Sequence, residues 1–228
     1  MRINQASTAA AVAAIVLSVG SNAHAAFVAS NAVVSPDGSY SDAYSSNGSY
    51  TYASTGAQGF SLEESVTISS LRFWGSSNQF NGLGLGNIAG FEIVIWNADF
   101  TAAISTTLIP TAAITSSATG SMNRFGGAEF LFELAIGGIL GAGNYNINIG
   151  AQLIDSEGDQ FVWSQGADTA TYFIADGTPF GAWRPFPNGI EESPGGAFEL
   201  QGGAIPGPGA TVLLALASLM GITSRRRR

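Results

Sequence analysis

Apolar and polar residues alternate along much of the chain between residues 59 and 202. Phe91, Ile93 and Ile95, for example, are each separated from the next by one residue. Because successive side chains of a strand point to opposite faces, this period of two predicts strands with one face toward a core. The pattern is clearest in four segments, SVTISSLRFWG (65–75), GFEIVIWN (90–97), AEFLFEL (128–134) and NYNINIG (144–150).

Clusters of turn-forming residues separate the predicted strands. They include NGLGLGN, GGILGAGN, ADGTP and RPFPNG, which are rich in residues that reverse the chain at low cost. No segment before Gly209 has a sustained helical period. The pattern therefore predicts an all-β fold, an antiparallel β-sandwich with a jelly-roll-like topology.

Residues 35–59 differ from the rest of the predicted domain in being rich in Ser, Tyr and Gly. Asp37-Gly38 and Asn47-Gly48 are typical turn dipeptides between short alternating runs. We expect one or two loosely ordered hairpins at the edge of a sheet. The alternative is a segment without stable structure.

The N-terminal segment 1–25 has the three parts of a secretory signal. Arg2 precedes the apolar run 9–19, and the small-residue pattern Ala23-His24-Ala25 stands before Ala26. We expect a signal helix that is removed by cleavage between Ala25 and Ala26. An uncleaved anchor is the alternative, but the apolar run is shorter than a membrane span requires.

The C-terminal segment 204–228 combines an apolar run with a basic end. Residues 209–224 carry no charge and give about 24 Å of helix, against about 30 Å of hydrocarbon. Lipid thinning and the reach of the following arginine side chains can close this gap. Arg225, Arg226, Arg227 and Arg228 are expected to stop translocation and to remain cytoplasmic. A buried helix with a solvated basic tail is the alternative to a transmembrane helix.

The same segment resembles the PEP-CTERM sorting tail of Gram-negative bacteria. The resemblance lies in Pro206-Gly207-Pro208, the short apolar helix and the terminal arginines, although the family's usual glutamate is Gly207 here. It implies that an exosortase cuts near the Pro-x-Pro motif and passes the protein to the cell surface or extracellular matrix. The order of strands and aromatic residues in 65–202 is similar to β-sandwich domains that carry such tails, which implies architecture only.

Residues 26–203 have the length of one domain and an acidic composition. They contain all 16 acidic residues but only three arginines, so their net charge is −13. This charge excludes nucleic acid as an expected partner. The chain has no cysteine, and its one histidine, His24, lies in the predicted signal, so we expect no thiolate or histidine chemistry.

Asp155, Glu157 and Asp159 alternate around a glycine in a predicted turn. Carboxylate oxygens clustered in this way could hold Ca²⁺, although the twelve-residue loop of an EF-hand is not present. A solvated acidic turn is the alternative interpretation. Calcium is the one cofactor that the sequence suggests.

A glycan-active enzyme would need two carboxylates about 5–9.5 Å apart. Glu92, Glu129 and Glu133 lie on predicted strands and are candidates. Each alternates with apolar residues, so we expect all three to point outward into solvent rather than into a catalytic cleft.

The tryptophans offer another route to a ligand, because flat rings stack on sugar faces. Trp74, Trp96 and Trp163 lie in predicted strands, where packing in the sheets is expected. Trp183 lies instead in the loop FGAWRPFPNG, beside Arg184, and could present its ring to a ligand. The alternative is that Trp183 closes one end of the sandwich.

Together these observations predict an exported, non-enzymatic protein with a structural or adhesive role at the cell surface or in the matrix. Its tail would hold it in the inner membrane in transit, and an exosortase-like enzyme would be its processing partner. A carbohydrate-binding module for exopolysaccharide is the first alternative. A glycan-active enzyme is the second.

Overall fold

The structure is a computed structural model of the chain. It describes residues 26–40, 42–46, 49–78, 84–155, 159–169, 172–174, 184–185 and 194–205. The predicted signal residues Ala23 and Ala25, the motif Pro206-Gly207-Pro208, and Arg225 to Arg228 lie outside the described residues, as do Trp183 and Glu157. Among the described residues, no helix has the length and apolar character to cross a bilayer.

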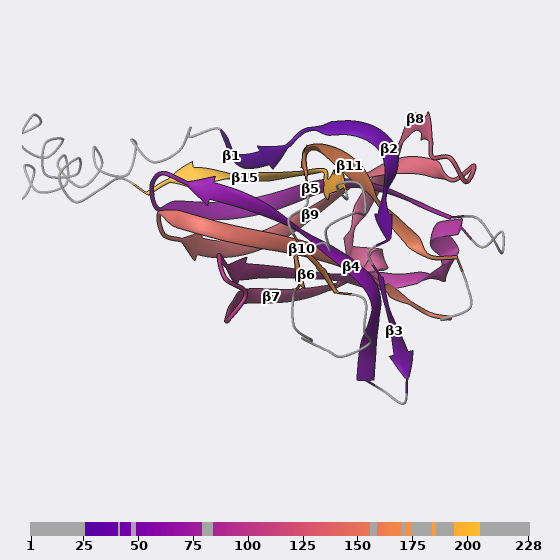
Figure 1. Ribbon diagram of the computed structural model, residues 1–228. Helices are drawn as coiled ribbons and strands as arrows, with labels where there is room; N and C mark the ends of the chain where they lie inside the picture. The colour runs from indigo at the N-terminus through magenta and orange to yellow at the C-terminus, as the bar shows by residue number, and fades with distance from the viewer. Residues whose placement is uncertain are drawn as a thin grey trace, which may run out of the picture.

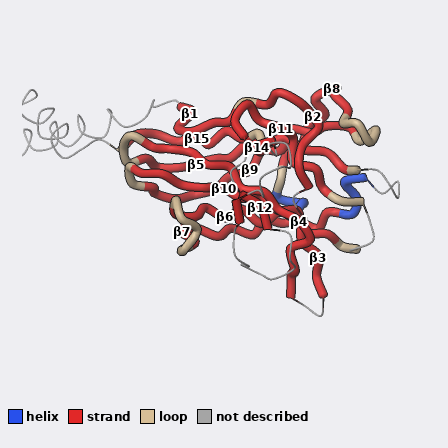
Figure 2. Tube along the Cα trace, viewed as in Figure 1, coloured by secondary structure: helices blue, strands red, loops and turns tan. Residues whose placement is uncertain are grey.

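The described chain consists almost entirely of strands, which confirms the predicted all-β class (Figure 2). The only helical elements in this part are the short 3₁₀ turns η1 (Gly84–Asn87) and η2 (Thr111–Ala113). The strands are β1 (Ala26–Asn31), β2 (Val33–Tyr40), β3 (Asp42–Ser46), β4 (Ser49–Leu62), β5 (Val66–Ser77), β6 (Ile88–Asn97), β7 (Ala103–Pro110), β8 (Thr115–Met122), β9 (Ala128–Leu140), β10 (Gly143–Leu153), β11 (Phe161–Thr169), β12 (Tyr172–Ile174), β13 (Arg184–Pro185), β14 (Pro194–Gly196) and β15 (Phe198–Ala204).

Two sheets make up the fold (Figure 1). In the first sheet β1 pairs with β15, β15 with β5, β5 with β9, and β9 with β8. In the same sheet β11 pairs with β5, β2 and β14. In the second sheet β13, β12, β4, β10, β6 and β7 follow one another, and β3 pairs with both β4 and β10. The strand pairs are antiparallel except β3–β10, which is parallel.

One hydrophobic core lies between the sheets and contains residues of both. Phe73 and Phe132 of the first sheet stack at 4.9 Å, and Phe91 of the second sheet meets Phe73 edge-on at 5.0 Å. Such ring contacts add about 0.5–1.5 kcal/mol each beyond the burial of their area. The shared core makes the arrangement sandwich-like.

The alternation correctly predicted which residues face this core. Phe91, Ile93 and Ile95 on β6 are buried in it, as are Ile147 and Ile149 on β10. The opposite face of β10 is also covered, because Asn146 and Asn148 are only 5% and 1% exposed. Their side-chain amides form hydrogen bonds with the backbone instead of with water. Asn148 Nδ2, for example, donates to the Gly56 oxygen at 2.8 Å.

The dipeptide Asp37-Gly38 is not a hairpin turn, so that prediction was wrong. Both residues lie within β2, which pairs with β11 through a bulge between Gly38 and Ser35. A Cβ on Gly38 would stand 1.6 Å from the backbone oxygen of Trp163. The glycine therefore permits a close approach of two strands rather than a reversal of the chain.

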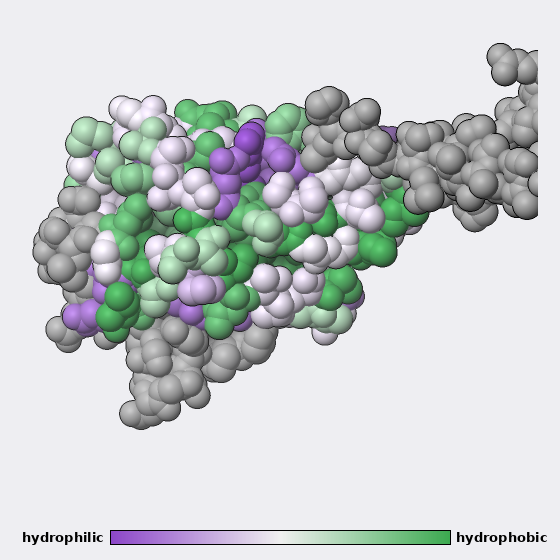
Figure 3. All heavy atoms as spheres, turned by 180° about the vertical axis from the view of Figure 1, so that it is seen from behind, coloured by the Kyte–Doolittle hydropathy of each residue, from purple (hydrophilic) through white to green (hydrophobic). Residues whose placement is uncertain are grey.

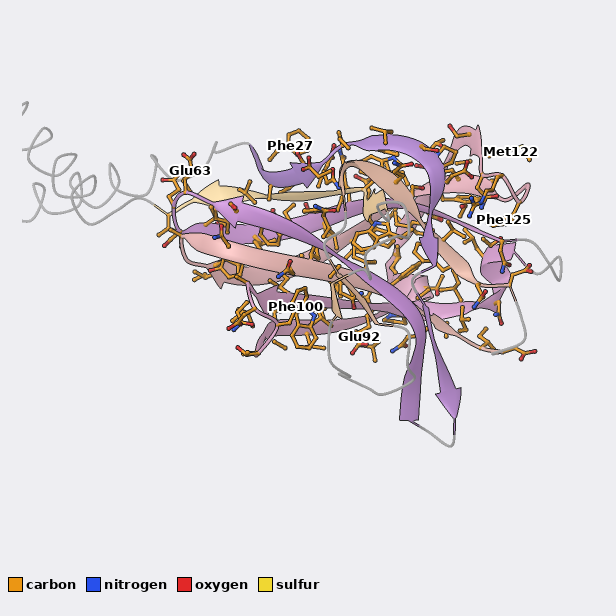
Figure 4. All side chains as sticks on the ribbon, viewed as in Figure 1. Phe27, Glu63, Glu92, Phe100, Met122 and Phe125 are labelled. Atoms are coloured by element: carbon orange, nitrogen blue, oxygen red, sulfur yellow. The ribbon has the colours of Figure 1, made fainter. Side chains whose placement is uncertain are left out.

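Both ends of the described chain lie at the same end of the sandwich. Ala26, the first residue of β1, pairs with Gly202 near the end of β15. The start of β1 and the end of β15 consequently meet at the left in Figure 1. Phe27 and Glu63 lie at this end, and Met122 and Phe125 at the opposite end (Figure 4).

Candidate functional site

A cavity of about 490 Å³ opens along one side of the sandwich. It is bordered by the edge of β1 and by the facing part of β4, which have no further strand beside them within the described residues. Residues from three distant parts of the chain reach it. They are Ala29 and Ser30 on β1, Gly59 to Ser61 on β4, and Asn144 to Asn146 on β10, with Ala98 and Asp168 at its border.

Two half-buried aromatic rings form the apolar part of this cavity. Phe60 and Tyr145 oppose each other in the β4–β10 register and stack with 5.6 Å between centroids and 27° between planes. Phe60 also meets the buried ring of Phe198 at 5.8 Å, and the Tyr145 hydroxyl donates to the Gly141 oxygen at 3.0 Å. The rings are thus anchored in the core at one edge and border the cavity at the other.

The polar part of the cavity is held by hydrogen bonds between neighbouring elements. The Ser61 hydroxyl donates to Asn144 Oδ1 at 2.7 Å. Asn146 Nδ2 donates to the oxygens of Asn97 and Ala98, at 3.3 and 3.1 Å, which ties β10 to the turn after β6. Asp168 is the charged residue among those that line the cavity. Stacked rings beside hydroxyl, amide and carboxylate groups suit a ligand with several hydroxyl groups.

The predicted calcium turn is organised around an asparagine. Asn87 Nδ2 donates to the backbone oxygens of Asp155 and Asp159, at 2.9 and 3.0 Å, and Asn87 Oδ1 accepts from the Asp155 amide at 2.9 Å. Asp155 is exposed, whereas Asp159 is fully buried. The described residues contain no cluster of three or more His, Cys, Asp or Glu that could hold a metal ion. Glu157 lies outside the described residues.

The three strand carboxylates are not brought together. Glu92 lies on β6 in the second sheet, whereas Glu129 and Glu133 lie on β9 in the first. Glu129 and Glu133 are four residues apart, which separates their backbones by about 13 Å along a strand. Glu133 forms an ion pair with Arg72, and Arg72 Nη1 also lies 3.9 Å from Glu199 Oε2. These positions do not form the close pair that glycoside hydrolysis requires.

Glu129 is not solvated, which corrects the prediction for that residue. It is 4% exposed, and its carboxylate accepts hydrogen bonds from two hydroxyls. Ser164 Oγ donates to Oε1 at 2.6 Å, and Thr119 Oγ1 donates to Oε2 at 2.8 Å. Alternation predicted that Glu129 faces away from the core, but it could not predict that this face is covered.

The strand tryptophans pack in the sheets as expected. Trp163 is 2% exposed in the core, and its Nε1 donates to the Ala197 oxygen at 2.9 Å. Trp96 is 6% exposed on the other face of β6, where the centroids of the Trp96 and Phe100 rings are 6.2 Å apart. Trp74 is partly exposed on β5.

The cavity residues were not predicted from the sequence. Tyr145 and Asn144 belong to a predicted strand, but their meeting with Phe60 depends on the β4–β10 register. Asp168 lies at the border of the cavity, and Asn31 Oδ1 accepts from its amide at 2.8 Å. Neither relationship has a local signal in the chain.

Comparisons with protein-family models, with curated proteins and with solved structures gave no significant match.

Proposed function

We propose that this chain is an exported, non-enzymatic protein with a structural or adhesive role at the cell surface or in the extracellular matrix. The observation that carries the proposal is the composition of its ends. An apolar run follows Arg2, and a Pro-x-Pro motif, a second apolar run and four arginines close the sequence. These are the features of a secretory signal and of a membrane-held sorting tail.

Each part of the tail has a separate role in this proposal. Arg225 to Arg228 stop translocation, and residues 209–224 hold the chain in the inner membrane. Pro206-Gly207-Pro208 marks the place where an exosortase-like enzyme releases the domain. The domain then remains at the surface or joins the matrix.

The position of the chain ends supports this arrangement. Ala26 pairs with Gly202, so the start of β1 and the end of β15 leave the sandwich together. If the domain is held by both segments during export, the end of the sandwich where β1 begins and β15 ends faces the membrane. The rest of its surface, including the cavity beside β1 and β4, faces away from the lipid.

We further propose that the sandwich is a jelly-roll. The strand order supports it: β1, β15, β5 and β9 form one four-stranded layer, and β4, β10, β6 and β7 form the other. Along the chain these eight strands alternate between the two layers, except that β7 follows β6 within the same layer. This is the order that the paired Greek keys of a jelly-roll produce.

The processing step can be tested with variants of the motif in the native host. A Pro206→Ala/Pro208→Ala double variant keeps the apolar run and the arginines, so it should accumulate in the membrane fraction. Gly207→Glu restores the motif usual in the family and is the matched control, which should be released at least as well as the natural chain. Release of the double variant at the natural rate would contradict the proposal.

Binding of exopolysaccharide through the cavity is a second candidate function. The stacked pair of Phe60 and Tyr145 beside Asn144 and Asp168 favours it. Asn144→Ala should then reduce retention of the protein in polysaccharide affinity gels, whereas Ser65→Ala, outside the cavity, should not. Trp183→Ala tests the loop tryptophan in the same gels. Mobility unchanged on all polysaccharides tested would count against this candidate.

A further inference from the structure

The strand β7 has a free edge. On one side it pairs with β6, from Pro110 opposite Gly90 to Ala103 opposite Trp96. On its other side no strand lies within the part of the chain that the structure describes. Its backbone donors and acceptors on that side are open to another strand. Ile104 and Leu108, two residues of this strand, are 49% and 57% exposed.

A second free edge lies close to β7, across the open side of the sandwich. β9 pairs with β8 only as far as Glu133, so the remainder of the described strand pairs with β5 alone. Between β7 and this part of β9 lies a cavity of about 190 Å³, bordered by Ile104, Ile136 and Ile139. Ile139 is 69% exposed, and the space beside Gly137 and Gly138 is open. A strand added to β7 would cover this cavity with its inward side chains.

The free edge is also uncharged. Residues 100–123, which include β7 and β8, contain no Asp, Glu, Lys, Arg or His, although residues 26–203 carry a net charge of −13. The nearest acidic residues are Asp99 in the preceding turn and Glu92, one strand inside the edge. Figure 3 shows one face of the molecule, on which strongly hydrophilic residues form only small clusters. A second copy with the same excess of negative charge would therefore meet little repulsion from the residues of β7 themselves.

Two other free edges, those of β8 and β1, are less suited to pairing. β8 has a register shift between Ala118 and Met122 and a glycine at positive φ, Gly120, so its edge is irregular. β1 is short, has a bulge between Phe27 and Ala29, and faces β4 across the larger cavity. The β7 edge is regular over most of its length, with one shift at its start between Ile95 and Trp96 of β6.

We propose that β7 is a homotypic assembly edge, at which two copies of the chain pair antiparallel and join their second sheets into one. The contact uses the same strand on both copies, so it closes as a two-fold dimer. This inference goes beyond the proposed function and does not depend on processing of the tail. It gives a matrix or surface protein a way to link neighbouring copies.

The geometry of such a pair predicts which residues meet. In a continuous sheet, outward side chains must oppose outward side chains, so one residue of β7 lies opposite its own counterpart on the two-fold axis. The strand has eight residues, and the greatest overlap places Thr106 or Thr107 on the axis. Directly opposed residues have Cβ atoms about 4.5–5.5 Å apart, which is close enough for a disulfide after minor adjustment.

Single-cysteine cross-linking tests this geometry, because the chain has no cysteine of its own. We would introduce Thr106→Cys and Thr107→Cys separately into the full chain, oxidise the purified protein in detergent, and measure disulfide dimers on non-reducing gels. Ser65→Cys is the control. The Ser65 oxygen accepts from the Ile205 amide at 2.9 Å, so Ser65 lies at the end where the tail begins and would report association through the tails.

One of the two threonine positions should yield a majority of covalent dimer, and Ser65→Cys should yield little. Thr106→Lys should weaken non-covalent association about fivefold, because two lysines would lie opposite or nearly opposite each other. Absence of dimer at both threonine positions, or equal cross-linking at Ser65, would overturn the proposal. Either result would leave the test of motif processing unaffected.

Discussion

Asn31, at the end of β1, holds the backbone of Asp168, at the end of β11, through both atoms of its amide. Asn31 Oδ1 accepts from the Asp168 amide at 2.8 Å, and Nδ2 lies 3.4 Å from the Asp168 oxygen. Nδ2 also donates to the Gly196 oxygen at 3.1 Å. Asn31 is 2% exposed, and its bond to the Gly196 oxygen is buried. One side chain thereby joins the first strand, the cavity border and β14.

Asn31→Ala should therefore lower the free energy of unfolding by about 2–3 kcal/mol, since it removes a partner of the buried Gly196 oxygen and of the partly buried Asp168 amide. The matched control is Asn144→Ala at an exposed position, which should change stability by less than about 0.5 kcal/mol. Urea denaturation followed by tryptophan fluorescence measures both. Equal effects of the two substitutions would show that the buried amide of Asn31 is not needed.

The buried carboxylate of Glu129 gives a second prediction. Glu129→Ala removes the acceptor of the Ser164 and Thr119 hydroxyls and should cost about 2–4 kcal/mol. Glu133→Ala, on the same strand but at a partly exposed ion pair with Arg72, should cost about 1 kcal/mol or less. A double-mutant cycle with Ser164→Ala isolates the coupling, which should be non-zero. Additive effects would mean that the Ser164–Glu129 bond contributes nothing.

Gly196 is expected to tolerate no side chain. A Cβ there would lie 2.1 Å from Cε2 of Trp163, whose ring is fixed in the core. Gly196→Ala should therefore destabilise the fold by about 1–3 kcal/mol through overpacking. Gly137→Ala, where nothing lies within 4 Å of the new Cβ, should be neutral or stabilising by up to about 1 kcal/mol. Thermal unfolding that ranks Gly137→Ala as the worse variant would contradict this packing.

The turn before β7 has a dependence on pH. The Thr101 hydroxyl and the Thr101 amide both donate to the Asp99 carboxylate. These bonds, the hydroxyl's most of all, lower the pKa of Asp99 below its ordinary value. A pKa that is lower in the folded than in the unfolded chain stabilises the turn above about pH 4, and this contribution is lost as pH falls through the folded pKa.

Thr101→Ala should return the Asp99 pKa toward its ordinary value, which an NMR titration of the side chain measures directly. An Asp99 titration unaffected by the substitution would contradict the proposed hydrogen bonds.

Residue alternation was sufficient to predict β5, β6, β9 and β10 and their core faces, because a period of two is set by local backbone geometry. It predicted the core positions of Phe91 and Ile147 for this reason. It did not predict β1, β7 or β8. It also did not predict that the opposite faces at Asn148 and Glu129 are covered, since coverage depends on segments distant in the chain. Gly38 shows a further limit: the same glycine pattern suits a turn and a close strand contact.

The cavity could not be predicted for a related reason. Phe60, Tyr145 and Asp168 come from three separate segments, and they meet only through strand registers and the Asn31 bridge. Registers are set by bulges and turns along whole strands rather than by the residues that finally line a site. The residues of the proposed signal and sorting tail, in contrast, are contiguous in sequence, so they can be recognised without knowledge of the fold.

The most direct test of the proposed sorting is intact-mass spectrometry of the protein recovered from membrane and matrix fractions of the native host. The proposal predicts a matrix species that begins at Ala26 and ends near Pro206. A membrane species that still carries Arg228, without a shortened matrix form, would contradict it and would indicate a permanently tethered protein.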